Sequence, residues 1–128
     1  MTPFGAKMRA LRAERGVSLT DMAKALGVSP SYLSALELGK RSKPSWAFVQ
    51  AATHYFNIIW DEAEELQKLA EVSAPKITLD TSALSPRATE FANRLARTIR
   101  KLDSADIERL HAALERSTKR RRKVAADG

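Results

Sequence analysis

The chain has 128 residues, of which 44% are hydrophobic, so it can bury one modest core with a small appended element, which excludes a large enzyme fold. Cysteine is absent, which excludes disulfides and thiolate metal sites, and Lys7, Arg9 and Arg12 stand where a secretory signal needs an apolar run. The longest uncharged stretch, residues 44–60, falls short of the ~20 apolar residues of a membrane helix, so we expect a soluble, cytoplasmic protein with no membrane association.

The formal net charge of +7 is concentrated at the two ends of the chain. Residues 1–44 hold eight basic and three acidic side chains, residues 111–128 hold six and two, and residues 45–75 hold one and five. This distribution favours a polyanionic partner, of which nucleic acid is the natural one, although an anionic membrane surface would be attracted by the same positive charge.

Helical periodicity dominates the sequence and predicts an all-α fold that begins with three short helices. The first ends near Gly16, and Ser18 caps a second, which Gly27 stops. Ser29, followed by Pro30, begins the third. The apolar residues that these helices are expected to turn inward are Phe4, Met8, Leu11, Leu19, Met22, Ala23, Leu26, Leu33 and Leu36.

Two further helices are predicted to complete a compact domain that spans residues 1–72. Pro44 and Ser45 open the fourth helix, and Asp61 and Glu62 begin the fifth, where negative charge suits the helix dipole. The residues expected on their inner faces are Trp46, Val49, Ala52, Phe56, Ala63, Leu66 and Leu69.

The composition changes after residue 72. Residues 73–85 are rich in Ser, Thr and Pro and predict a linker or an arm. A short strand that includes Ile77 and Leu79 is an alternative for part of this segment. Residues 86–116 carry apolar side chains at helical spacing on two successive helices and predict an αα-hairpin. The remaining residues, 117–128, have no apolar period and predict a disordered basic tail.

The segment from Leu19 to Leu38, LTDMAKALGVSPSYLSALEL, sets a small residue, a glycine and two leucines at fixed offsets. Ala23 suits the close crossing of two helices, and Gly27 supplies a left-handed turn without a Cβ penalty. Leu33 and Leu36 then hold the second helix of the pair against the first. In order and spacing, this segment resembles the helix-turn-helix of the Cro/C1 (Xre) repressor family.

The resemblance covers residues 4–66, from LRAERG through ELGKR to PSWAFVQAATHYFNI. It implies a five-helix, lambda-repressor-like domain whose third helix, residues 29–38, lies in the major groove of double-stranded DNA. Glutamine, asparagine or arginine often occupies the base-reading positions of this family, and their absence here indicates readout through water and DNA shape. The base-reading positions that the resemblance implies are Pro30, Ser31, Ser34 and Ala35.

The resemblance also implies contacts to the DNA backbone, and Tyr32 is placed to reach phosphate or sugar. Leu19 departs from the family's usual glutamine, so the start of the second helix, with Ser18 and Thr20, is expected to bind phosphate there. The loop GKRSKP supplies a clearer set of phosphate contacts just beyond the third helix. These residues are Lys40, Arg41, Ser42 and Lys43.

Several residues are expected to have no functional role of their own. In the resembled family Arg12 and Glu37 pair across the first and third helices, so we expect a structural ion pair. His54 and His111 lack a nearby ligand set, so neither a metal nor a cofactor is expected. Because no nucleophile with a base, no paired carboxylates and no phosphate-cradling loop occur, the chain is not expected to be an enzyme.

A single recognition helix contacts few base pairs, so specificity demands two half-sites about 34 Å apart and a two-fold partner. We expect the hairpin to supply a homodimer interface, swapped or side by side, although it can instead pack on its own N-terminal domain as extra core. The expected interface residues are Phe91, Leu95, Ile99, Ile107, Leu110 and Leu114.

The sequence therefore predicts a sequence-specific DNA-binding transcriptional regulator, in particular a dimeric repressor that occupies a two-fold operator. The alternative is an antitoxin-type or other protein-binding module that also regulates its own promoter. In that case the C-terminal part binds a partner protein, and residues 76–128 become ordered only with that partner.

Overall fold

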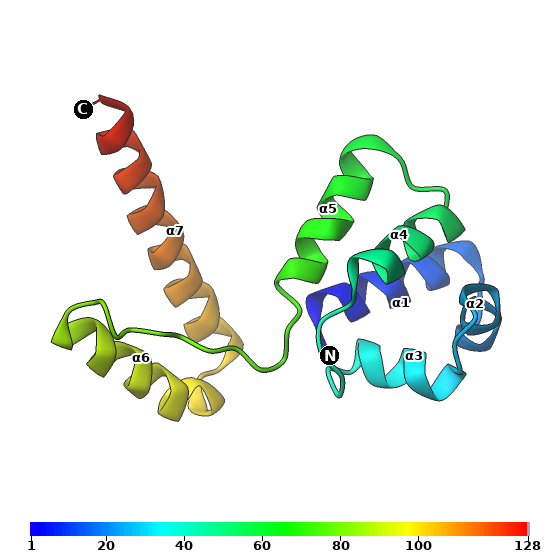
Figure 1. The fold of residues 1–128 in the computed structure, drawn as a ribbon, viewed down its shortest axis with the longest axis horizontal. Coiled ribbons are helices and arrows are strands. Elements are labelled where there is room, and N and C mark those ends of the chain that lie inside the picture. Colours follow the sequence, from blue (N-terminus) through cyan, green and yellow to red (C-terminus); the bar gives the residue numbers. More distant parts are fainter. Residues whose placement is uncertain (128) are drawn as a thin grey trace. The chain divides into compact units, whose positions relative to one another are not determined.

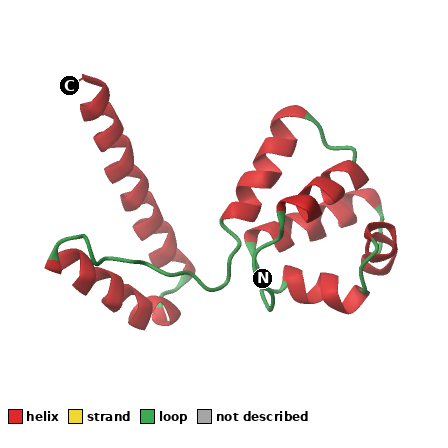
Figure 2. Cartoon of the chain, viewed as in Figure 1, coloured by secondary structure: helices red, strands yellow, loops and turns green. Residues whose placement is uncertain are grey.

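The computed structural model describes the backbone of residues 1–127 and the side chains of residues 1–121. Every regular element in this range is helical, which confirms the all-α fold (Figures 1 and 2), and Ile77 and Leu79 lie in a loop rather than in a strand. The chain divides into two units, Met1–Thr78 and Leu79–Gly128. Within the described residues, no helix combines the length and the apolar character needed to cross a membrane.

Hydroxyl side chains begin four of the five helices of the first unit. Thr2, Ser18, Ser29 and Ser45 each accept a hydrogen bond from the backbone N–H three residues further on, which satisfies a donor that the helix leaves free. Gly27 ends the second helix with φ 72°, as predicted from its freedom to adopt the left-handed conformation. The five helices are α1 (Pro3–Arg15), α2 (Leu19–Leu26), α3 (Pro30–Glu37), α4 (Trp46–Tyr55) and α5 (Trp60–Glu71).

All five helices contribute side chains to the core of the first unit, which contains most of the apolar residues expected from the sequence. Trp46 is an exception, because 68% of its surface is exposed. Phe48, two residues further along α4, packs against this core instead, with its ring edge-on to Phe4 at a centroid distance of 6.3 Å. The buried residues of this core are Phe4, Met8, Leu11, Met22, Ala23, Leu33, Val49, Ala52, Phe56, Ile58, Leu66 and Ala70.

The start of α1 packs directly on the end of α3. A Cβ atom at Gly5 would lie 2.7 Å from the Cα of Glu37 and closer still to its carbonyl oxygen, so only glycine fits this approach. The backbone N–H of Thr2 donates to the same carbonyl oxygen at 3.0 Å. The N–H of Phe4 donates to the hydroxyl of Ser73 at 3.0 Å, which ties α1 to the segment after α5.

A buried ion pair strengthens the contact between α1 and α3. Arg12 donates through Nη2 to Glu37 Oε1 at 2.9 Å and through Nη1 to Oε2, while Arg9 Nε lies 3.6 Å from Oε1. Glu37 is fully buried and Arg12 is 7% exposed. Removal of either partner would leave a buried charge without compensation, which costs about 3–5 kcal/mol.

The second unit consists of α6 (Pro86–Thr98), a short 3-10 helix η1 (Ile99–Lys101) and α7 (Ser104–Asp127). Asp103 and Asp106 form a reciprocal cap at the start of α7, in which each backbone N–H donates to the other carboxylate at 3.1 and 2.8 Å. In Figure 1, α6 and α7 diverge from the turn that joins them.

The structure continues α7 to Asp127, through residues that the sequence analysis assigns to a disordered tail at 117–128. A helix that is already nucleated and capped extends with little cost, and Lys, Arg and Ala are favourable helix residues. The side chains of residues 122–127 and all of Gly128 lie outside the described residues.

No side chain of residues 79–121 is buried within the second unit. Phe91 is 65% exposed and Leu114 is 62% exposed, although both belong to apolar stripes at helical spacing. Because a stable unit normally buries such stripes, these two helices lack a core of their own.

We predict that Gly5→Ala destabilises the first unit by about 1–3 kcal/mol, because the added methyl group meets backbone atoms of Glu37. Urea unfolding followed by circular dichroism measures the free energy of unfolding. Ala10→Gly, at an exposed site on the same helix, measures the difference in helix propensity between alanine and glycine. Helix propensity alone would make Gly5→Ala stabilising by up to about 1 kcal/mol. A gain in stability for Gly5→Ala would show that the close contact is absent.

Candidate nucleic-acid interface

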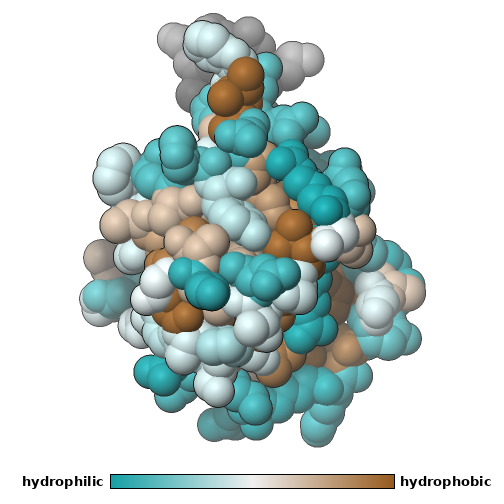
Figure 3. Space-filling view, turned by 90° about the vertical axis from the view of Figure 1, so that its right-hand side faces the viewer, coloured by the Kyte–Doolittle hydropathy of each residue, from teal (hydrophilic) through white to brown (hydrophobic). Residues whose placement is uncertain are grey.

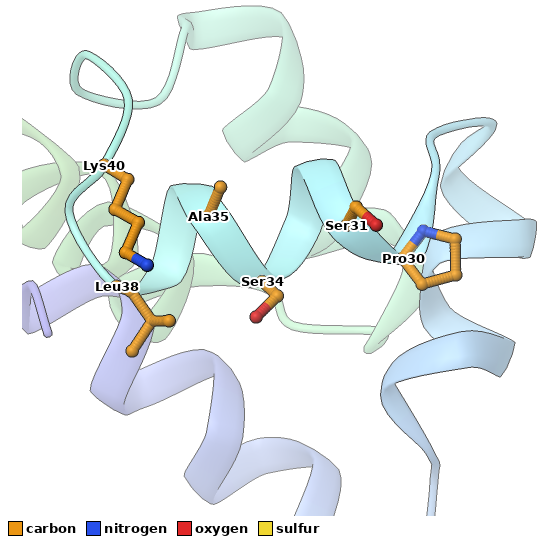
Figure 4. Close-up of a pocket in the computed structure, with 6 residues that line it drawn as sticks. All are labelled: Pro30, Ser31, Ser34, Ala35, Leu38 and Lys40. Carbon is orange, nitrogen blue, oxygen red and sulfur yellow. The ribbon is translucent and has the colours of Figure 1, made fainter.

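One face of α3 is open to solvent, and the opposite face is buried. Leu33, Leu36 and Glu37 point into the unit, whereas the outer face borders a shallow hollow of about 430 Å³ (Figure 4). Pro30 and Ser31 are exposed at the start of this face. The residues that line the hollow are Pro30, Ser31, Ser34, Ala35, Leu38 and Lys40, so the four predicted base-reading positions all lie in it.

The hollow combines two hydroxyl groups, several apolar groups and one ammonium group, and no carboxylate lines it. Lys40 extends from the loop after α3 back alongside the end of the helix, near Leu38 (Figure 4). Within residues 1–121, the hydroxyls of Ser31 and Ser34 donate to no other protein group. This arrangement leaves hydroxyl donors and acceptors free for a ligand and a positive charge at one end of the surface.

Leu38 is the residue of this face that the sequence analysis missed. It is 37% exposed and follows Ser31, Ser34 and Ala35 at the spacing i, i+3, i+4 and i+7, which places all four on one side of the helix. That spacing is visible in the sequence and could have identified Leu38.

The loop after α3 carries the predicted backbone-binding residues, all of which are exposed. The guanidinium group of Arg41 lies 5.3 Å from the ring centroid of Tyr32, a cation–π contact that holds Arg41 beside α3. Lys43 is oriented differently, because its Nζ lies 2.8 Å from Glu71 Oε2 at the end of α5. The hydrogen bond and charge of Lys43 lower the pKa of Glu71. Within residues 1–121, Lys40 and Arg41 therefore have no acidic partner, whereas Lys43 is paired with Glu71.

The start of α2, the other predicted phosphate contact, has an acidic residue in its first turn. The hydroxyl oxygen of Ser18 accepts a hydrogen bond from the backbone N–H of Asp21 at 3.0 Å, which caps the helix. The O–H group of Ser18 can still donate a hydrogen bond to a phosphate. Thr20 and Asp21 are both exposed. The carboxylate of Asp21 weakens the attraction of this helix end for a phosphate, an effect that the sequence analysis did not weigh.

The surface on the α2 side of the first unit is mostly hydrophilic or weakly polar, with hydrophobic residues scattered across it (Figure 3). Within the described residues, no group of three or more His, Asp or Glu side chains is arranged to hold a metal ion. The polar groups accessible on the outer face of α3 and in the loop after it are hydroxyl, guanidinium and ammonium groups.

Comparison with known proteins links this geometry to a family. Residues 3–66 match the helix-turn-helix domain family. The chain is 40% identical over 65 residues to YazB, an HTH-type transcriptional regulator of Bacillus subtilis, and the match covers 51% of this chain and 93% of YazB. It is 32% identical over 79 residues to RghR, an HTH-type transcriptional repressor of the same organism, covering 59% of this chain and 58% of RghR.

The HTH-type transcriptional regulator SinR of Bacillus subtilis is 30% identical over 68 residues, which cover 50% of this chain and 61% of SinR. The chain thus spans about three fifths of the length of RghR and SinR. No solved structure matches the chain.

The family match begins in α1, ends in α5 and includes the whole of α2 and α3 with the turn between them. The relatives are transcriptional regulators, a non-enzymatic family, in agreement with the expectation that the chain is not an enzyme. The chain therefore belongs to the helix-turn-helix family of transcriptional regulators, of the Cro/C1 (Xre) type.

Proposed function

We propose that the protein is a sequence-specific repressor that binds double-stranded DNA in the cytoplasm as a dimer on a two-fold operator. The observation that carries this proposal is the open face of α3, where Ser31, Ser34 and Ala35 are accessible beside Lys40 and Arg41. An α-helix fits the major groove of B-DNA, and flanking cations bind the phosphates on either side. The similarity to RghR, an HTH-type transcriptional repressor, supports a role in repression rather than activation.

The side chains of α3 suggest how the protein selects its operator. Serine hydroxyls donate to or accept from several bases, and the apolar groups of Pro30, Ala35 and Leu38 suit the methyl group of thymine. None of the residues of α3 can make the bidentate contact that arginine or asparagine makes with a purine. Direct readout of one half-site is therefore weak, and DNA shape and bridging water supply the rest of the selectivity.

Weak readout at one half-site makes a second recognition helix necessary, and the second unit offers a means to supply it. Its apolar stripes are exposed and no side chain of residues 79–121 is buried. A second copy of the same helices presents identical stripes, so a two-fold pairing would bury both sets at once. The proposed interface residues are Phe91, Leu95, Ile99, Ile107, Leu110 and Leu114.

The same stripes also suit a different protein, which is the alternative function of an antitoxin-type or other protein-binding regulator. The observation that favours this alternative is again the absence of a core in residues 79–121. The two functions differ in what covers the stripes, a second copy or another polypeptide, and the oligomeric state of the purified chain distinguishes them.

We predict that Lys40→Ala/Arg41→Ala weakens binding to all DNA sequences and reduces the slope of log K against log salt by about 1.8, since each phosphate contact contributes about 0.9. Fluorescence anisotropy with a labelled duplex at several salt concentrations measures the slope. Lys68→Ala/Lys76→Ala removes the same charge from exposed sites outside α3 and its loop, and should leave the slope nearly unchanged. Equal slopes for both double variants would remove Lys40 and Arg41 from the interface.

We predict that Leu110→Glu converts the full-length protein from a dimer to a monomer, because it places a charge in the apolar stripe of α7. Sedimentation equilibrium measures the mass, and circular dichroism checks that the helices remain. Ala105→Glu introduces the same charge on the opposite side of α7 and should remain dimeric. A wild-type chain that is monomeric alone but co-purifies in a fixed ratio with another protein would favour the antitoxin-type alternative.

A further inference from the structure

The second unit carries a charge pattern that the proposed dimer does not use. Its residues 79–121 hold ten basic and six acidic side chains, and the basic ones are exposed. Most of the basic residues of α6 and α7 lie to one side of the apolar stripes, as their spacing along each helix shows. Arg121, seven residues after Leu114, is the exception, because it lies in line with the stripe of α7.

In α6 the basic residues share one face. Arg87, Arg94 and Arg97 follow one another at i, i+7 and i+10, which keeps them on the same side of the helix. Phe91 and Leu95 lie on the adjoining side, where they form the apolar stripe. A hollow of about 400 Å³ lies on the basic face and is lined by Glu90, Asn93, Arg94 and Arg97.

In α7 the basic and apolar faces are separated more clearly than in α6. Ile107, Leu110 and Leu114 occupy one side at i, i+3 and i+7. Arg109, Arg116 and Arg120 follow at i, i+7 and i+11 on another side, which is centred about 130° around the helix axis from the apolar stripe. Burial of the apolar stripe would therefore turn this basic face toward solvent. The helix has 24 residues, so at 1.5 Å per residue it is about as long as one turn of B-DNA.

Most of these arginines have no acidic partner within the described residues. Arg87 pairs with Glu90 at 2.7 Å, and Arg109 pairs with Asp106. Arg94, Arg97, Arg116 and Arg120 make no ion pair in residues 1–121, although exposed carboxylates occur on both helices. Four guanidinium groups per chain are thus available to an external anion.

We propose that the basic faces of α6 and α7 form a second DNA-binding surface, which binds the phosphate backbone outside the base pairs that α3 contacts. Guanidinium groups suit phosphate because they present planar, paired donors. A phosphodiester chain is favoured over a membrane surface, because the apolar stripes that would enter a membrane are the ones assigned to the dimer interface. This inference rests on the proposed function, since it extends the DNA contact of the same regulator.

The test compares full-length variants that differ only in where two positive charges are removed. Arg94→Gln/Arg97→Gln and Arg116→Gln/Arg120→Gln each remove a pair from one basic face, and Lys68→Gln/Lys76→Gln is the matched control from the first unit. Binding is measured by fluorescence anisotropy at several salt concentrations, with a selected operator in a minimal duplex and in a duplex extended on both sides. Sedimentation and circular dichroism establish that each variant keeps its helices and its oligomeric state.

We expect each arginine variant to bind the extended duplex at least tenfold more weakly near 0.15 M salt, with a reduced salt slope and an unchanged preference for the operator sequence. The lysine control should bind as the wild type does, and Glu90→Gln, which removes a negative charge from the α6 face, should bind more tightly. Salt slopes and affinities equal to the wild type in both arginine variants would overturn the proposal.

Vesicles that contain phosphatidylserine provide the second arm of the test. Wild-type binding to these vesicles that the arginine variants lose, together with unchanged DNA binding, would assign the basic faces to membranes and overturn the proposal. A different result would show that the proposed function itself is wrong. In that case the wild type would show no sequence preference, and Lys40→Ala/Arg41→Ala would bind DNA as the wild type does.

Discussion

The first unit depends on the way α1 holds the last residue of α3. The carboxylate of Glu37 is buried and bound by both Nη atoms of Arg12, while its carbonyl oxygen accepts from the N–H of Thr2. Gly5 allows the two backbones to approach this closely. A buried ion pair contributes little net stability when compared with apolar side chains, but an arrangement that separates Arg12 from Glu37 would leave a buried charge without compensation. The contact therefore fixes the direction of α3.

The direction of α3 decides what the molecule can bind. Because the C-terminal end of α3 is held and Leu33 and Leu36 are buried, the remaining face must point outward with Ser31, Ser34 and Ala35. The cations that accompany this face come from the loop just beyond the fixed end, so their positions follow from the same contact. Recognition and phosphate binding thus share one structural origin in the first unit, whereas the second unit has exposed apolar and basic faces and no core.

Much of the first unit could be predicted from local sequence signals. Ser18, Ser29 and Ser45 cap helices at the expected places, and Gly27 has the left-handed conformation that its position in the turn requires. These features depend on residues within one turn of each other, so the sequence records them directly. The outer face of α3 was located through the family resemblance, because composition alone does not distinguish a recognition helix from any other amphipathic helix.

The features that were missed depend on contacts between distant residues or on competing local effects. Nothing near Gly5 indicates that it lies against Glu37, and the partner of Lys43 is 28 residues away at Glu71. Trp46 and Phe48 both lie in the first turn of α4, and Phe48 packs inward against Phe4 of α1, which is 44 residues away in the sequence. The basic tail lacks an apolar pattern, yet a capped helix extends through it to Asp127.

Amide chemical-shift mapping of the full-length protein with an operator duplex obtained by in vitro selection shows whether α3 and the loop after it contact DNA. We expect the largest shifts on the backbone amides from Ser31 to Leu38 and on the loop at Lys40 and Arg41, while the buried amides of α1 change little. Shifts that leave Ser31 and Ala35 untouched and gather on another part of the molecule would contradict this expectation.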